Sequence, residues 1–76
     1  MHFGTTMQIF INTLGGRTIA MYVDPSNKVE DVKGQIGALT GAKPEMIRLI
    51  YGTRQLENGK CLSEYNIIHD STINCA

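Results

Sequence analysis

The sequence predicts an α+β domain in which a mixed sheet of about five strands packs on one helix. Apolar and polar residues alternate over residues 7–14 and again over 19–23, which is the period of half-buried strands. A single helical stripe of apolar residues follows within residues 28–40. Short apolar runs separated by glycine-containing turns occupy the remainder of the chain and are typical of further strands.

The first two strands are predicted to form a hairpin. Met7, Ile9 and Ile11 share one face of the first strand, and residues 19–23 alternate in the same way. The two glycines at residues 15–16 can adopt the positive φ angles of a tight turn between alternating strands, so they do not form a phosphate-binding loop.

The predicted helix covers residues 28–40 and begins after Ser26 or Asn27, either of which can cap its first turn. Gly34 and Gly37 each weaken it by about 1 kcal/mol relative to alanine. Gly41 is a natural C-cap. The helical stripe comprises Val29, Val32, Ile36 and Leu39.

The second half of the chain predicts a strand at residues 47–51 with Leu49 inward and a short strand around residues 55–56. A single helical turn is predicted beside Ser63, and a last strand at residues 71–75. The resulting core would comprise Ile9, Ile11, Ile19, Met21, Val23, Val29, Val32, Ile36, Leu49, Leu56, Leu62, Ile67, Ile73 and Cys75.

Composition excludes several classes of function. Seven basic and seven acidic residues balance, so no surface for nucleic acid is predicted. Neither a phosphate-binding Gly-Lys-Ser/Thr loop nor zinc-ligand spacing occurs, and no cofactor or metal is expected. No apolar run is long enough to cross a bilayer, and residues 1–6 lack the pattern of a secretory signal. We therefore expect a cytoplasmic or nuclear protein without a membrane partner.

The two cysteines are expected to be free thiols, because a reducing compartment disfavours disulfides. Cys61, Cys75, His2, His69 and Asp70 supply the residue types of a thiol enzyme but form no recognisable motif. The sequence therefore predicts no catalytic residues and no enzyme activity.

The exposed apolar residues are more informative about function. If Leu49 points inward, its neighbours Arg48 and Ile50 must point outward. Leu14, at the tip of the first hairpin, has no inward role either. Isolated surface residues of this kind are common, whereas a contiguous apolar patch marks a docking site.

Several segments resemble the ubiquitin family without gaps from Met7 to Ala76. The segments that carry the resemblance are 7–10, 13–14, 24–26, 32–33, 48–52, 55–59 and 62–67. The resemblance implies the β-grasp fold, with residues 1–6 as an extension and 7–76 as a monomeric ubiquitin-like domain. It also implies a role in protein binding or signalling in the ubiquitin pathway.

In that family, an apolar patch binds ubiquitin-binding domains. The resemblance places Leu14 and Ile50 within the patch and Arg48 and Gly52 beside it. Two other patch positions differ, since Asn74 replaces a histidine and Ala76 replaces a valine. The resemblance also implies a second surface at Gln8, Phe10 and Thr18, although an incidental exposed aromatic residue explains Phe10 equally well.

The covalent chemistry of the family has no counterpart in these 76 residues. The given chain stops without the glycine-ended tail that forms the isopeptide bond. The family's linking lysines are replaced by Asn12, Arg17, Gln35, Leu39, Arg54 and His69, which leaves Lys33. The expected function is therefore that of a non-conjugatable interaction domain. The alternatives are a modifier whose Gly-Gly tail lies beyond Ala76, or a domain that captures conjugating enzymes through Cys75.

Overall fold

A computed structural model describes residues 6–76 of the chain. Its elements, in order along the chain, are β1 (Met7–Asn12), β2 (Thr18–Val23), α1 (Val29–Thr40), the 3₁₀ turn η1 (Pro44–Met46), β3 (Leu49–Tyr51), β4 (Arg54–Gln55), the 3₁₀ turn η2 (Leu62–Tyr65) and β5 (Thr72–Cys75). The predicted extension falls mainly on residues 1–5, which lie outside the described residues. No helix within residues 6–76 is long and apolar enough to cross a membrane.

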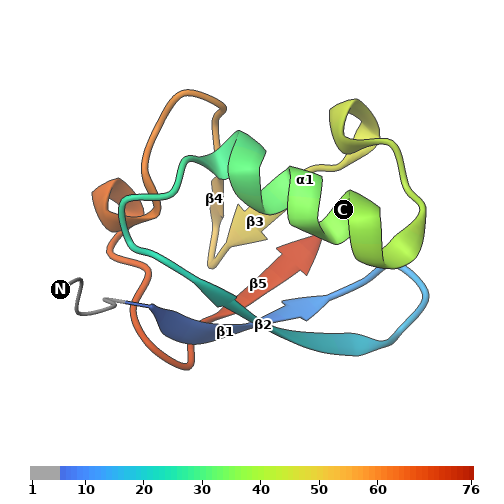
Figure 1. Cartoon of the computed structure of the whole chain (residues 1–76), viewed down its shortest axis with the longest axis horizontal. Coiled ribbons are helices and arrows are strands. Elements are labelled where there is room, and N and C mark those ends of the chain that lie inside the picture. The colour runs from blue at the N-terminus through green and yellow to red at the C-terminus, as the bar shows by residue number, and fades with distance from the viewer. Residues whose placement is uncertain (1–5) are drawn as a thin grey trace, which may run out of the picture.

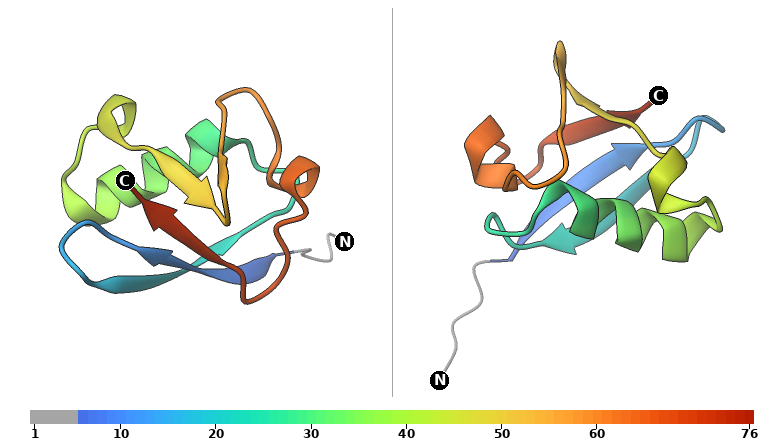
Figure 2. Two further views of the ribbon diagram at one scale, coloured as in Figure 1. Left: turned by 180° about the vertical axis from the view of Figure 1, so that it is seen from behind. Right: turned by 90° about the horizontal axis from the view of Figure 1, so that it is seen from above.

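The strands form one mixed sheet in the order β2-β1-β5-β3-β4. The last strand, β5, pairs in parallel with β1 and antiparallel with β3, so it lies at the centre of the sheet. α1 crosses one face of this sheet, and no helix among residues 6–76 covers the opposite face (Figures 1 and 2). This is the β-grasp arrangement, and the predicted fold class is confirmed.

The core lies between α1 and the sheet and differs from the predicted core at five positions. Ile19 and Cys75 are only partly buried, because both pack at the margin of the cluster. Met7, Ile47 and Tyr65 are buried although they were not predicted. Tyr65 can be buried because its hydroxyl accepts a hydrogen bond from the Glu57 N–H at 2.9 Å.

For one residue of the predicted helical stripe, the predicted burial is wrong. Leu39 is 61% exposed, whereas Val29, Val32 and Ile36 are buried. The stripe leaves the sheet near the end of the helix. α1 ends at Thr40, one residue after Leu39, and Gly41 then turns the chain away with φ +80°. Gly41 is thus confirmed as the C-cap, and its N–H donates to the Gly37 carbonyl at 2.8 Å.

Neither Ser26 nor Asn27 caps the helix. Lys28 is the N-cap residue, and its own N–H donates to the Asp31 carboxylate at 2.9 Å. The Asn27 side chain instead accepts the N–H of Asp24 at 2.8 Å and so fixes the turn that precedes the helix. The third strand is likewise shorter than predicted, because Ile47 donates to the Pro44 carbonyl and completes η1.

A carboxylate on α1 secures the turn before η2. Glu30 accepts the N–H of Gly59 at 2.7 Å, and this hydrogen bond lowers the pKa of Glu30 below its ordinary value of 4.5. A lowered folded-state pKa contributes stability that is complete above the unfolded value and is lost as pH falls through the folded value. Below pH 4.5 the contribution of this bond therefore declines.

We expect an NMR titration to give a Glu30 midpoint below 4.5. Glu30→Gln should flatten the acid side of the curve of unfolding free energy against pH. Glu45→Gln, at an exposed glutamate on η1, is the matched control and should leave the curve unchanged. Equal curves for the two variants would contradict the assigned role of the Glu30–Gly59 bond.

Candidate docking face

The uncovered face of the sheet brings Ile50 and Asn74 side by side. β3 and β5 pair Ile50 with Asn74, and β5 and β1 pair Asn74 with Asn12. Paired residues present their side chains on the same face of a sheet. Ile50 is half-buried at this point, whereas Asn74 is exposed.

A polar ladder continues from Asn74 across the same face. The Asn12 amide nitrogen donates to the Asn74 side-chain oxygen at 3.0 Å, and the Thr18 hydroxyl donates to the Asn12 side-chain oxygen at 2.8 Å. Asn12 was not among the predicted site residues, although the strand alternation places it on the same face as Gln8 and Phe10. The ladder joins the two predicted surfaces, because Thr18 belongs to the second and Asn74 to the first.

Leu14 stands at the end of this face, on the turn between β1 and β2. The turn is held by Thr13, whose N–H and hydroxyl both donate to the Arg17 carbonyl at 2.8 and 3.0 Å. Gly16 closes it with φ +85°. Leu14 is 80% exposed and therefore available to a partner without rearrangement of the turn.

The other predicted positions flank Ile50. Ala76 donates its N–H to the Arg48 carbonyl at 2.9 Å, which continues the pairing of β5 with β3 by one step. Gly52 forms the turn after β3 with φ +63° and is exposed. Ala76 and Arg48 are exposed as well, so small and basic groups border the apolar side chain of Ile50.

The residues of the predicted second surface lie on the neighbouring strands β1 and β2 and differ in their exposure. Phe10 is half-buried between Ala20 on β2 and Thr72 on β5. Gln8 lies one step further, and its backbone N–H donates to the His69 side chain at 3.1 Å. The two surfaces are parts of one continuous face of the sheet.

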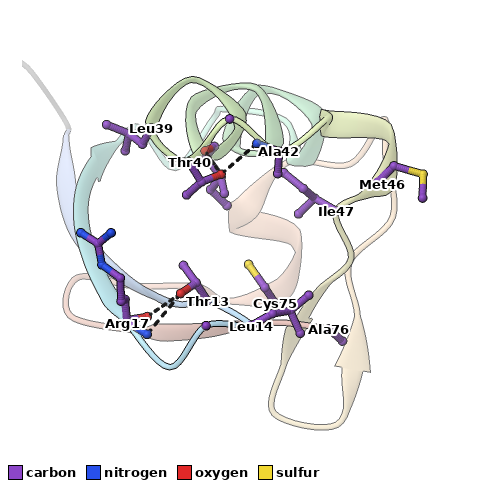
Figure 3. Close-up of a pocket in the computed structure, with 13 residues that line it drawn as sticks. Thr13, Leu14, Arg17, Leu39, Thr40, Ala42, Met46, Ile47, Cys75 and Ala76 are labelled. Carbon is purple, nitrogen blue, oxygen red and sulfur yellow. Dashed lines mark hydrogen bonds between the residues drawn. The ribbon is translucent and has the colours of Figure 1, made fainter.

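A pocket of about 600 Å³ lies beside the β1–β2 turn, at the border of this face (Figure 3). Its walls come from the β1–β2 turn, the end of α1, η1 and the end of β5. Leu14 and Ala76 line it, together with Leu39, Met46 and Cys75, whereas Ile50 and Asn74 do not. Leu14 therefore stands between the sheet face and the pocket.

The two cysteines lie on different elements of the fold. Both are free; Cys61 precedes η2 and Cys75 ends β5. Burial raises the pKa of the Cys75 thiol, which opposes formation of the reactive thiolate. His69 contacts Gln8 and, at 3.4 Å, Asp70. Among residues 6–76 no group of three or more His, Cys, Asp or Glu residues could hold a metal ion.

We expect Cys75 to react slowly with a thiol reagent at neutral pH in the folded protein, at a rate below that of a free cysteine. Labelling followed by proteolysis and mass spectrometry of the peptide that contains Cys75 measures this rate separately from that of Cys61, and the denatured protein supplies the reference. Labelling of Cys75 as fast in the folded as in the denatured protein would support the alternative that this thiol captures conjugating enzymes.

Comparison with known proteins gives consistent matches. The profile described as "Ubiquitin family" matches residues 9–76. The chain is 38% identical over 71 residues to AN1-type zinc finger protein 4 of Mus musculus, which covers 93% of this chain but 10% of that protein. It is 38% identical over 61 residues to Large proline-rich protein bag6-A of Xenopus laevis, covering 80% of this chain and 5% of that protein. It is 36% identical over 61 residues to Ubiquitin-like protein NEDD8 of Dictyostelium discoideum, covering 80% of this chain and 79% of that protein.

Proposed function

We propose that this chain, which belongs to the ubiquitin family, is a protein-interaction domain. It would dock ubiquitin-binding domains without covalent attachment. The docking surface would be formed by the following six residues: Leu14, Arg48, Ile50, Gly52, Asn74 and Ala76. The proposal concerns binding and requires no catalytic group. Two of the relatives support such a role, since in each the similar segment is a small part of a much longer protein.

The observation that carries the proposal is the juxtaposition of Ile50 with Asn74 and Ala76 on a sheet face that no helix of the described part of the chain covers. Ile50 supplies an apolar anchor, and the exposed Leu14 supplies a second one at the end of the same face. Asn74 and Ala76 bury less apolar surface than the histidine and valine that the family resemblance implies there. Each such loss of an anchor typically costs about 1 kcal/mol or more, so binding should be weak.

The test is an NMR titration of the labelled chain with a ubiquitin-binding helix. We expect the largest shift changes at Ile50, Asn74 and Leu14. Leu14→Ala should weaken binding several-fold, and because Leu14 is 80% exposed this change should not unfold the domain. Ala76→Val should strengthen binding, because it restores apolar area beside Ile50.

Ile68→Ala is the matched control. Ile68 is 66% exposed and is not one of the six docking residues, so its truncation removes similar apolar area without touching the docking surface. An unchanged spectrum around Ile50 at saturating helix would reject this surface. So would equal losses of affinity for Leu14→Ala and Ile68→Ala.

A second candidate function is a ubiquitin-type modifier, favoured by the similarity that covers 79% of the NEDD8 relative. Ala76 is exposed and pairs with Arg48 at the end of β5, so residues that followed it would leave the domain beside the docking face. Sequencing the transcript past the codon for Ala76 and measuring the intact mass of the endogenous protein distinguish the two functions. A terminal Gly-Gly would favour the modifier.

A further inference from the structure

The strand β2 forms one edge of the sheet, with β1 as its sole partner strand among residues 6–76. Its sequence, TIAMYV, contains no charged residue and no proline. Natural edge strands are usually protected against pairing by lysine, proline, bulges or very short length. β2 has six residues in uninterrupted register with β1 and has none of these features.

The backbone groups that face outward from β2 can be assigned. Alternate residues of a strand direct their N–H and C=O groups to opposite sides. Phe10 donates its N–H to the Ser71 carbonyl at 2.9 Å, so the backbone groups of Phe10 face β5. The backbone groups of its neighbour Ile11 therefore face β2, where Ile11 pairs with Ile19. The remaining backbone groups of β2 therefore point away from the sheet, and they belong to Thr18, Ala20 and Tyr22.

These three residues are self-complementary about a two-fold axis through Ala20. In an antiparallel pair of two β2 strands, Ala20 lies opposite Ala20 of the second copy, and Thr18 lies opposite Tyr22. Each of the three residues then donates and accepts one hydrogen bond. All three side chains are exposed in the single chain, and the smallest one lies on the axis, where the two copies approach most closely.

The charges at the ends of β2 select the antiparallel orientation. Arg17 precedes the strand and Asp24 follows it, so antiparallel pairing brings Arg17 of one copy near Asp24 of the other at both ends. Parallel pairing would place like charges together. The formal net charge of the chain is +0, so no overall repulsion opposes association.

We propose that the chain forms a symmetric dimer in which two β2 strands pair antiparallel and join the two sheets into one. The occupant of this edge is a second copy of the same chain. The pairing would also cover Ile19, which is only partly buried in the single chain. It uses the opposite end of the strand order from β3 and β4, so β3, which carries Ile50, lies outside the interface.

Sedimentation equilibrium of the full chain tests the proposal. The apparent mass should rise with protein concentration from 8.4 kDa toward twice that value. Hydrogen exchange of the Thr18, Ala20 and Tyr22 amides should slow over the same concentration range, because dimerisation protects them. A single 8.4 kDa species at millimolar concentration would overturn the proposal, as would fast exchange of these amides in the dimer.

Ala20→Glu and Thr72→Glu form a matched pair of variants. Both replace exposed residues that flank Phe10 in the same row of the sheet face, but only Ala20 lies on the open edge. Ala20→Glu places two like charges together on the axis and should raise the dimer dissociation constant about tenfold or more. Thr72→Glu should leave it within about twofold. Equal effects of the two variants, or none from Ala20→Glu, would place the interface elsewhere.

Discussion

Replacing Ile36 with alanine should lower the free energy of unfolding by about 2–5 kcal/mol. Ile36 is 2% exposed on the sheet-facing side of α1, so truncation removes buried apolar contacts and leaves a void. The lost free energy is a large part of the total for a domain of this size, since small domains are stable by about 5–15 kcal/mol. Urea denaturation followed by circular dichroism measures the change, with the slope of the transition as a check on two-state behaviour.

Leu39→Ala is the control for Ile36→Ala within the same helix. Leu39 shares the predicted stripe but is 61% exposed, so its truncation should change the free energy of unfolding by less than about 0.5 kcal/mol. Ile36 also lines the 600 Å³ pocket. If neighbouring pocket side chains partly fill the void left by Ile36→Ala, the loss of unfolding free energy would lie near the lower end of the expected range. A loss below 1 kcal/mol for Ile36→Ala would contradict the core described above.

The two glycines of α1 should respond differently to replacement by alanine. A Cβ atom at Gly34 would meet no atom within 4 Å, so Gly34→Ala should stabilise the domain by about 1 kcal/mol through helix propensity alone. A Cβ atom at Gly37 would lie 2.7 Å from the Ala42 carbonyl oxygen and 3.1 Å from the Pro44 ring. Overpacking of this kind costs about 1–3 kcal/mol, which offsets the propensity gain and leaves Gly37→Ala neutral to destabilising by about 2 kcal/mol.

Each glycine variant is the control for the other, because both make the same chemical change in the same helix. Thermal unfolding should show a higher Tm for Gly34→Ala than for wild type, and a Tm for Gly37→Ala that is below that of Gly34→Ala by several degrees. Equal increases would show that the segment carrying Ala42 and Pro44 moves aside without cost. The contact at Gly37 would then have no role in holding η1 against α1.

The sequence was sufficient for the fold because period-two alternation and glycine turns are local signals. Residues 7–14 and 19–23 alone predict a hairpin, and Gly41 predicts where α1 ends. The misplaced positions depend on tertiary packing instead. Neither the burial of Tyr65 nor the exposure of Leu39 follows from spacing, because the first requires the Glu57 N–H and the second requires the direction of the chain after Gly41.

The candidate docking face was predicted in outline but not in its connections. Alternation around Leu49 placed Ile50 outward, and the resemblance supplied Leu14 and Asn74. The hydrogen-bonded ladder through Asn12 needed the parallel pairing of β1 with β5, two strands separated by most of the chain. Long-range pairing of this kind is invisible to local patterns, which is why the two surfaces were predicted as separate.

The central position of β5 has a consequence for how the domain is made. The strand that joins the β1–β2 hairpin to the β3–β4 hairpin is the last of these five strands to leave the ribosome. Until residues 72–75 emerge, the two hairpins have no strand between them, and the nascent chain exposes the residues that later line the core. Folding of this domain should therefore be concerted and should begin only after residues 72–75 have emerged, and a stop codon before Thr72 should yield an unfolded chain rather than a shortened domain.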